Sequence, residues 1–368
     1  MRLRAVELRR VRLALRTPFV SSSGAEYERD LLLVRASTDV GEGWGECCAL
    51  SAPLYTSEYV DAAHAVLRSH LLPRLFAAER LEASMVASLL RPVQGHRMAK
   101  AAIEMALLDA ELRATGVPLA SRLGGVRTSV DAGVSLGIAG HLRSLLAEVD
   151  RCLSQGYRRV KLKVGPGWDV EPVRAARAAF GPDLPLQVDA NSAYTLSDLH
   201  HLRALDGFGL LLIEQPLPPD QLLAHAKLAV ELETPICLDE SIVSAEAAED
   251  AITLGACRVV NVKAARVGGY LEAVRVHDVC AREHVPVWCG GMLETGLGRA
   301  GNVALASLPN FTLPGDLSAS DRYYEEDLTS PFWLEDGRLA VPTGPGLGVT
   351  VDAGRLDRLT TAVERVGC

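Results

Sequence analysis

Residues 158–164 read RRVKLKV, and this stretch decides how the rest of the chain is interpreted. Its apolar residues alternate with charged ones, which is the two-residue period of a β-strand. The same period places the side chains of Lys161 and Lys163 on one face of that strand. Because like charges on one face repel, the stretch is either a solvated edge strand or a strand whose lysines face negative charge.

Short apolar runs of the same kind recur between amphipathic segments from about residue 130 onward. Helical patterns such as DVEPVRAARAAF and LLAHAKLAVELE separate them. This alternation indicates βαβ units and a parallel sheet, and eight strands suggest a closed (β/α)8-type barrel. The candidate strands are AGVSLGI, RRVKLKV, LPLQVDA, GLLLIEQ, TPICLDE, RVVNVKA, VPVWCGG and, at the end, FTLPGD.

The segments that flank the barrel lack this alternation. The chain begins with two long alternating runs, VELRRVRLAL and DLLLVRASTD, and continues into helical patterns. We interpret residues 1–125 as an α+β capping domain, completed by about residues 323–368, and residues 126–322 as the barrel. The predicted fold is therefore α/β, a modified (β/α)8-type (TIM) barrel with an N-terminal α+β capping domain.

Five successive candidate strands end in an ionisable residue. These residues follow one another at intervals of 24 to 26 positions, which is about the length of one βα unit. Charges that occurred by chance would be scattered through helices and loops, whereas these keep the strand repeat. In barrels the carboxyl ends of the strands carry the active site. The five residues are Lys163, Asp189, Glu214, Asp239 and Lys263.

The three acidic residues of this series predict a metal site. Consecutive strands would place Asp189, Glu214 and Asp239 along one arc of the barrel rim, where their charges repel unless a cation joins them. An all-oxygen ligand set with open positions suits Mg²⁺, with Mn²⁺ or Co²⁺ as substitutes. We therefore expect one divalent ion in each active site.

The two lysines of the series predict acid/base chemistry. Lys163 on the second strand and Lys263 on the sixth lie on opposite sides of an eight-stranded barrel, with the metal-bound substrate between them. Removal of a proton α to a carboxylate creates an enediolate, which a divalent metal stabilises. A lysine serves as the base when neighbouring cations lower its pKa, and Lys161 and the metal are such neighbours of Lys163.

Four further residues lie beside these strand ends, and two interpretations stay open for each. Lys161 either orients the substrate carboxylate and lowers the pKa of the neighbouring lysine, or only balances charge. Asn191 and Glu240 either support the ligands and lysines or stabilise local structure. Arg266 either tunes the pKa of Lys263 or forms a surface salt bridge.

Ser135 lies within Gly-Val-Ser-Leu-Gly, which matches the weak motif G-x-S-x-G. A hydrolase nucleophile requires a strained strand-to-helix turn with Asp and His partners, so we expect Ser135 to bind substrate instead, near the end of the first barrel strand. A set of mostly apolar residues completes the expected substrate pocket. Its members are Gly291, Met292, Leu293, Phe19, Leu50 and Tyr323.

The motifs around these residues resemble those of one family. They are KLK (161–163), VDAN (188–191), IEQPL (213–217), CLDES (237–241), NVKAARVGG (261–269) and WCGGMLETGLGRA (288–300). Together with GEGWGEC, SAPLY and LPGD, they are similar to the muconate-lactonising subgroup of the enolase superfamily. More narrowly, they resemble the N-acylamino acid racemase / o-succinylbenzoate synthase family, over nearly the whole chain.

This resemblance implies an enolase-like fold in which loops around 17–24 and 49–59 of the capping domain close over the barrel mouth. It also implies that the three strand-end carboxylates bind the metal and that Lys163 and Lys263 are the acid/base pair. The implied reaction is racemisation of N-succinyl or N-acetyl amino acids, syn-dehydration to o-succinylbenzoate for menaquinone synthesis, or both. The two activities use the same residues, and Arg266 favours racemisation.

Two other readings of the same residues stay open. A dipeptide epimerase or a muconate-type cycloisomerase would share the acid/base machinery and differ in the capping loops. A non-catalytic metal-binding barrel is a more remote alternative, and the two strand-end lysines argue against it because a metal alone needs no base.

The composition excludes several other classes of protein. Hydrophobic residues make up 48% of the 368, enough for a large core, and the net charge of −8 without a long basic run argues against nucleic acid. No apolar run is long enough for a membrane span or a signal peptide. The eight cysteines form no C-x-x-C and fit a reducing compartment. This composition predicts a cytoplasmic protein. As partners we expect a small-molecule carboxylate substrate and further copies of the chain in a homo-oligomer.

Overall fold

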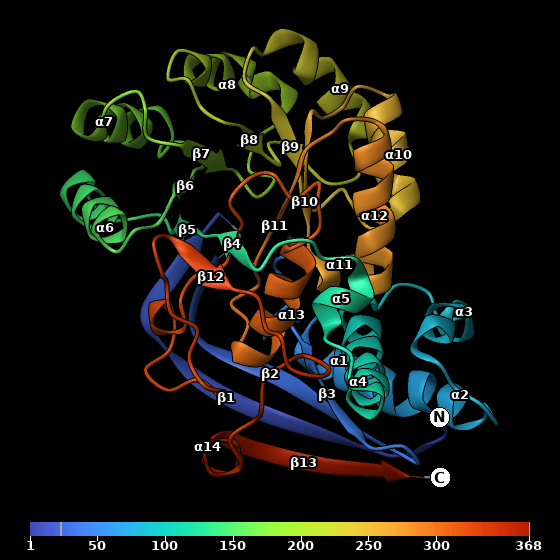
Figure 1. Ribbon diagram of the computed structural model, residues 1–368. Helices are drawn as coiled ribbons and strands as arrows, with labels where there is room; N and C mark the ends of the chain where they lie inside the picture. The colour runs from blue at the N-terminus through green and yellow to red at the C-terminus, as the bar shows by residue number, and fades with distance from the viewer. Residues whose placement is uncertain (23, 368) are drawn as a thin grey trace.

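The computed structural model describes residues 1–22 and 24–367 and contains two main sheets (Figure 1). One is a seven-stranded parallel sheet in the order β11-β10-β9-β8-β7-β6-β5, and the other is a four-stranded antiparallel sheet. The parallel strands follow the predicted series: β5 (Gly133–Leu136), β6 (Arg159–Lys163), β7 (Leu186–Asp189), β8 (Ile213–Glu214), β9 (Ile236–Leu238), β10 (Val259–Val262) and β11 (Val287–Cys289).

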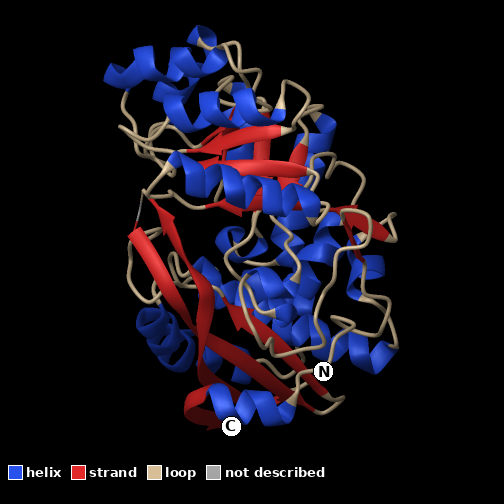
Figure 2. Cartoon of the chain, turned by 90° about the vertical axis from the view of Figure 1, so that its left-hand side faces the viewer, coloured by secondary structure: helices blue, strands red, loops and turns tan. Residues whose placement is uncertain are grey.

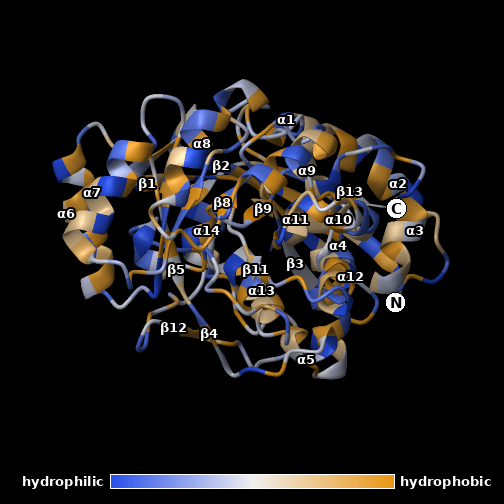
Figure 3. Cartoon of the chain, turned by 90° about the horizontal axis from the view of Figure 1, so that it is seen from above, coloured by the Kyte–Doolittle hydropathy of each residue, from blue (hydrophilic) through white to orange (hydrophobic). Residues whose placement is uncertain are grey.

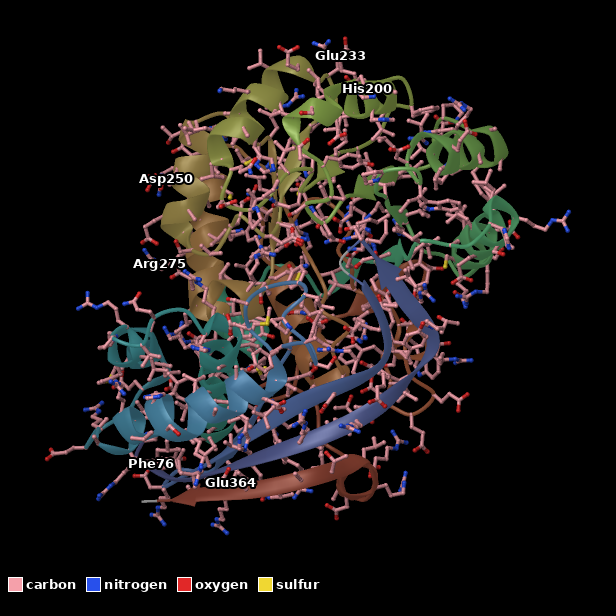
Figure 4. All side chains as sticks on the ribbon, turned by 180° about the vertical axis from the view of Figure 1, so that it is seen from behind. Phe76, His200, Glu233, Asp250, Arg275 and Glu364 are labelled. Atoms are coloured by element: carbon pink, nitrogen blue, oxygen red, sulfur yellow. The ribbon has the colours of Figure 1, made fainter. Side chains whose placement is uncertain are left out.

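Helices follow the parallel strands and cover the outside of the curled sheet (Figure 1). Hydrophobic and hydrophilic residues alternate along most of these helices, as Figure 3 shows from above. Within residues 142–154 the buried Leu145, Val149 and Cys152 lie three or four positions apart, which is the pattern of a helix packed on a core. Charged side chains such as Asp250 and Arg275 project from the outer helices (Figure 4). The helices are α6 (Leu142–Ser154), α7 (Val170–Phe180), η3 (Leu196–Asp198), α8 (Leu199–Asp206), α9 (Leu222–Glu231), α10 (Ala245–Thr253), α11 (Ala264–Val267), α12 (Tyr270–Arg282) and α13 (Gly296–Ala306).

The predicted eighth strand, FTLPGD, is wrong in detail, because this segment forms isolated bridges instead of a ladder. Phe311 bridges to Val287 of β11, and Gly315 bridges to the residue before β5. The Gly133 amide donates to the Gly315 carbonyl at 2.7 Å. Pro314 has no N–H to donate, which interrupts a continuous ladder at this point. The segment still joins the first and last parallel strands, so the barrel is closed.

The antiparallel sheet combines both ends of the chain. Its order is β13-β1-β2-β3, with β1 (Leu3–Ser21), β2 (Gly24–Thr38), β3 (Glu42–Cys47) and β13 (Thr360–Gly367). Ala5 of β1 pairs with Gly367, so the last strand lies beside the first (Figure 1). This sheet and the barrel occupy separate parts of the molecule (Figure 2). Segment 17–24, predicted as a loop, is the tip of the β1–β2 hairpin, except that residue 23 lies outside the described residues.

Helix α4 (Arg97–Thr115) packs directly against β3, and the GEGWGE motif explains how. A Cβ on Gly43 or Gly45 would collide with the backbone of Ala106 or Ala102 of this helix. Glycine therefore allows the strand and the helix backbone to approach closely. The remaining elements of this part and of the C-terminal segment are α1 (Val60–Val66), the π-helix η1 (Leu67–Leu71), α2 (Leu72–Phe76), η2 (Ala83–Met85), α3 (Val86–Leu90), α5 (Leu119–Leu123), β4 (Ser129–Asp131), η4 (Ser320–Arg322), β12 (Arg338–Ala340) and α14 (Ala353–Leu359).

Among the helices of the described ranges, none combines the length and the hydrophobicity that crossing a lipid bilayer requires.

Candidate active site

A cavity lies between the barrel mouth and the capping sheet, and most of the predicted site residues line it. It encloses about 850 Å³ of space, part of which is open to solvent. Strand ends contribute the three lysines, and the capping domain and two loops contribute most of the apolar side chains. The predicted residues that line it are Phe19, Leu50, Ser135, Lys161, Lys163, Asn191, Lys263, Gly291, Met292, Leu293 and Tyr323.

The three strand-end carboxylates lie directly below this lining and are buried. Lys163 pairs in register with Asp189 across β6 and β7, and Asp189 pairs with Glu214 across β7 and β8. Asp239 follows the end of β9, and all three carboxylates are at most 1% exposed. The predicted strand repeat therefore brings these side chains together at one edge of the sheet.

Lys161 is held by three carboxylates and does not lie on a solvated edge. Its ammonium group lies 2.6 Å from Asp316, 3.0 Å from Glu214 and 3.1 Å from Asp189, and the residue is 2% exposed. Burial lowers the pKa of Lys161, but the three carboxylates outweigh burial and raise the pKa above its ordinary value. A permanent positive charge is thus fixed beneath the site.

The side chain of Lys163 points to two oxygen acceptors. Its Nζ donates to Asp189 Oδ2 and to Asn191 Oδ1, both at 2.6 Å. Asn191 has a left-handed backbone, with φ of +42°, and its side-chain amide donates to Glu240 at 3.0 Å. Burial and the charge of Asp189 raise the pKa of Glu240 to about 7. Asn191 and Glu240 therefore connect Lys163 to the opposite side of the site.

Lys263 is bound by Asp239 and by a tyrosine that the sequence had not singled out. Lys263 Nζ donates to Asp239 Oδ2 at 2.8 Å and to the Tyr55 hydroxyl at 2.9 Å, and it lies 4.8 Å from the centre of the Tyr55 ring. Tyr55 in turn donates to Asp239 at 3.2 Å. Burial lowers the pKa of Lys263, whereas Tyr55, Glu240 and Glu214 raise it, with a net upward direction. SAPLY was recognised as a motif, but nothing in it indicated a contact with a lysine on β10.

Arg266 is buried, so the interpretation as a surface salt bridge is wrong. It is 3% exposed and forms an ion pair with Asp239. Its guanidinium also donates to the carbonyls of Ile242 at 2.9 Å and Asn261 at 2.7 Å. Arg266 and Lys263 therefore share one carboxylate, and the Arg266 amide also donates to the Lys263 carbonyl at 3.0 Å.

The carboxylates present fit a divalent cation by the chemistry of their donors. Asp189, Glu214 and Asp239 are oxygen donors on three adjacent strands, and the buried Glu240 Oε2 has no hydrogen-bond partner among the described residues. In this structure, lysine ammonium groups lie against these three carboxylates. Accordingly, no three Asp, Glu, His or Cys side chains in the described part of the chain converge in the manner of a metal site.

Several other lining residues were missed by sequence reasoning. Asp316, from the LPGD motif, pairs with Arg159 at 2.7 Å as well as with Lys161. Burial raises the pKa of Asp316, but these two cations outweigh it and lower the pKa to about 2. Ser135, which was predicted, lines the cavity with a buried hydroxyl that lacks a partner among the described residues. The other missed lining residues are Ser21, Gly24, Glu26, Leu54, Tyr55, Glu294 and Arg299.

Comparison with known proteins supports the same grouping. Residues 4–124 match the N-terminal domain family of mandelate racemase / muconate lactonizing enzyme, and residues 144–355 match the enolase C-terminal domain-like family. An N-succinylamino acid racemase from Amycolatopsis sp. is 61% identical, with 100% of both chains covered. An o-succinylbenzoate synthase from Geobacillus kaustophilus is 46% identical, covering 96% of this chain and 95% of that one.

Solved structures agree with the sequence comparisons. An enolase-superfamily member from Listeria innocua superimposes with a TM-score of 0.95 at 40% identity, covering 100% of this chain and 99% of that chain. A dipeptide epimerase from Cytophaga hutchinsonii, complexed with Mg and the dipeptide D-Ala-L-Val, gives a TM-score of 0.91 at 25% identity and full coverage of both chains. The chain is therefore an enzyme and belongs to the mandelate racemase / muconate lactonizing enzyme family of the enolase superfamily.

Proposed function

We propose that this enzyme removes the proton α to a carboxylate and racemises N-acylamino acids, with formation of o-succinylbenzoate as a second activity of the same site. One observation carries the proposal: Lys163 ends β6 and Lys263 follows β10, four strands apart in a closed barrel, and both side chains line one cavity. A carbon held between them is accessible to a lysine on each face.

Racemisation uses both lysines in turn. Lys163 takes the α-proton from one face, and the ammonium form of Lys263 returns a proton to the other face of the planar enediolate. Asn191 and Asp189 fix the position of one Nζ, while Tyr55 fixes the other. Because the α-carbon gains a proton on the face opposite to the one it lost, its configuration inverts.

We further propose Mg²⁺ as the cofactor, held by Asp189, Glu214 and Asp239. When bound, the ion would stabilise the negative charge that develops on the enediolate, and its charge would offset that of the carboxylates around the lysines. Lys161 contributes positive charge of its own, since its ammonium group is fixed by three carboxylates below the cavity.

Dehydration would not require Lys263 to transfer a proton. In a syn-elimination Lys163 removes the α-proton and then delivers a proton to the leaving hydroxide on the same face, so water is lost and Lys263 only balances charge. Arg266 supports racemisation as one of the activities. It shares Asp239 with Lys263, and Lys263 is the lysine that dehydration does not use as a base.

Proton exchange into D₂O tests the assignment of the two lysines. With Mg²⁺ present, wild-type enzyme should exchange the α-proton of both enantiomers of N-succinyl-phenylalanine or N-acetyl-methionine. Lys263→Ala should lose exchange of one enantiomer and keep the other, and Lys163→Ala should show the reverse. Lys227→Ala, on the exposed face of α9, is the matched control and should exchange both. Exchange of both enantiomers by Lys263→Ala would overturn the two-base mechanism.

A panel of other carboxylates decides between this function and its alternatives. Faster turnover of dipeptides or of muconate than of any N-acylamino acid would refute the proposed substrate class. Failure to turn over any N-acylamino acid with Mg²⁺ would refute the proposed reaction. Homo-oligomerisation and a cytoplasmic location also remain predictions, which size-exclusion chromatography and cell fractionation would test.

A further inference from the structure

Leu293 has a backbone conformation that branched aliphatic residues rarely adopt. Its φ is +56°, in the left-handed region, where the side chain crowds the neighbouring carbonyl. Such a conformation persists only when the surrounding structure enforces it, and it is found preferentially at functional sites. Leu293 lines the cavity, so its conformation determines where this part of the wall lies.

The backbone around Leu293 is fixed by hydrogen bonds from other segments. The hydroxyl of Tyr324, which is 2% exposed, donates to the Leu293 carbonyl at 2.6 Å. Arg299 Nη2 donates to the Glu294 carbonyl at 3.0 Å. The Met292 amide donates to the side chain of Glu294 at 2.9 Å. Of these bonds, only the one from Tyr324 acts on Leu293 itself.

The capping domain holds Thr295, two positions after Leu293. Glu46 of β3 accepts hydrogen bonds from the hydroxyl and the amide of Thr295 at 2.6 and 3.0 Å. Asn302 of α13 holds the side chain of Glu294 at 2.9 Å. With both neighbours of Leu293 fixed in this way, the Tyr324 hydroxyl has a rigid frame against which it can hold the strained residue.

We propose that Tyr324 is a positioning residue that sets which amino-acid side chain the cavity accepts, by holding Leu293 in its left-handed conformation. This inference rests on the proposed function and deepens it. Without the hydroxyl, Leu293 is free to relax to an ordinary conformation, which turns its side chain to a different direction and moves the wall. The lysines and carboxylates lie on strand ends that Tyr324 does not touch, so the proton transfers stay intact.

Tyr324→Phe tests the inference because it removes the hydroxyl and keeps the buried ring. The measurement is kcat/KM with N-succinyl-alanine, N-succinyl-methionine and N-succinyl-phenylalanine. The ratio between the best and the worst of these should fall by about tenfold, which is the discrimination that one misfitting methylene group gives. The kcat for the best substrate should change by less than about threefold, since the reacting groups are unaltered. An unchanged ratio would overturn the inference.

A double-mutant cycle separates this role from a general loss of stability. Leu293→Gly adopts a φ of +56° without strain, so in that background Tyr324→Phe should leave the selectivity ratio unchanged. If the effects of the two substitutions on the selectivity ratio simply add, the inference that Tyr324 acts through Leu293 is refuted. Tyr194→Phe is the matched control, because it also removes a buried hydroxyl, one that donates to Asp169 at 3.1 Å, and it should keep the wild-type ratio.

Amide hydrogen exchange gives a readout that does not depend on turnover. Exchange at residues 292–295 should be faster in Tyr324→Phe than in wild type, and unchanged in Tyr194→Phe. Equal protection in Tyr324→Phe and wild type would refute the inference even if activity differed. If wild-type enzyme turned over none of the three substrates, the proposed function would fail, and protection of this loop would decide the inference alone.

Discussion

Replacement of Lys161 by Met should strongly destabilise the protein, because it removes a buried cation and leaves its three carboxylates in place. The substitution keeps the length of the side chain and its contact with Trp288, whose ring centre lies 4.8 Å from the ammonium group. Each carboxylate keeps at least one other side-chain partner: Lys163 for Asp189, Asn261 for Glu214 and Arg159 for Asp316. The substitution therefore removes one charged partner from a buried network of ion pairs and hydrogen bonds.

Two estimates give the size of the effect. Removal of one member of a buried ion pair costs about 3–5 kcal/mol in free energy of unfolding. Separately, the pKa of Asp316 falls from 3.8 to about 2 on folding, which corresponds to roughly 2 kcal/mol of stability for that carboxylate alone, part of it from Arg159. This contribution is present above the unfolded pKa of Asp316 and is lost as the pH falls through its folded pKa. The difference between wild type and variant should therefore be largest above about pH 4 and shrink below it.

Urea unfolding in the presence of a chelator, followed by circular dichroism, measures the difference. Lys227→Met, at an exposed position, is the control and should change stability by less than about 0.5 kcal/mol. Added Mg²⁺ should reduce the loss in Lys161→Met, because a bound cation replaces part of the missing charge. A loss below about 1 kcal/mol in chelator would refute the assignment of Lys161 as the main counter-ion of this cluster.

Three further predictions concern the metal ion and two buried positions of the capping domain. Exhaustive dialysis against chelator should abolish α-proton exchange, and Mg²⁺ should restore it; exchange that survives would contradict the proposed cofactor. Gly45→Ala should destabilise the protein by about 1–3 kcal/mol or more in urea unfolding, because the new methyl group meets the backbone of Ala102, and a neutral result would contradict the packing of β3 on α4. Burial raises the pKa of Glu104, which accepts a hydrogen bond from the Leu271 amide, to about 8. The folded state therefore keeps that proton up to about pH 8, whereas the unfolded state keeps it only up to about pH 4.5. Wild type should therefore lose stability relative to Glu104→Gln as the pH rises from about 4.5 to about 8. Parallel profiles of unfolding free energy against pH for the two proteins would refute the argument.

The charged half of the site could be predicted from the sequence because its signals are local. A strand places every second side chain on one face, and a βα unit returns the chain to the same edge after about 25 residues. These two regularities are enough to bring Lys163, Asp189 and Glu214 into register, as the structure has them. The series of three carboxylates and the opposed lysines follow from the same regularities.

The rest of the site has no such signal. Tyr55 reaches Lys263 from a loop more than 200 positions earlier in the chain, and Asp316 reaches Lys161 from a segment whose proline prevents a regular ladder. A single residue in a loop gives no periodicity from which its direction could be inferred. The position of Arg266 was ambiguous for a related reason. A charged residue just past a strand is exposed or buried according to what packs on it. Here the guanidinium of Arg266 is buried against Asp239 and two backbone carbonyls.

The two halves of the site therefore differ in how substitutions should act. The lysines that we propose to move protons are fixed by buried hydrogen bonds at the ends of strands β6 and β10, and a change there should alter the reacting groups for every substrate. The walls come mainly from four segments distant in sequence: the β1–β2 hairpin around residues 19–26, the loop around Tyr55, residues 291–294, and residues 316–323. Because the walls contact the substrate away from its α-carbon, changes in them should alter kcat/KM differently for different substrates while the exchange chemistry persists. A family that keeps one chemistry and varies its substrates would be expected to change the walls first, and Tyr324 and Leu293 are the positions where this wall is held under strain.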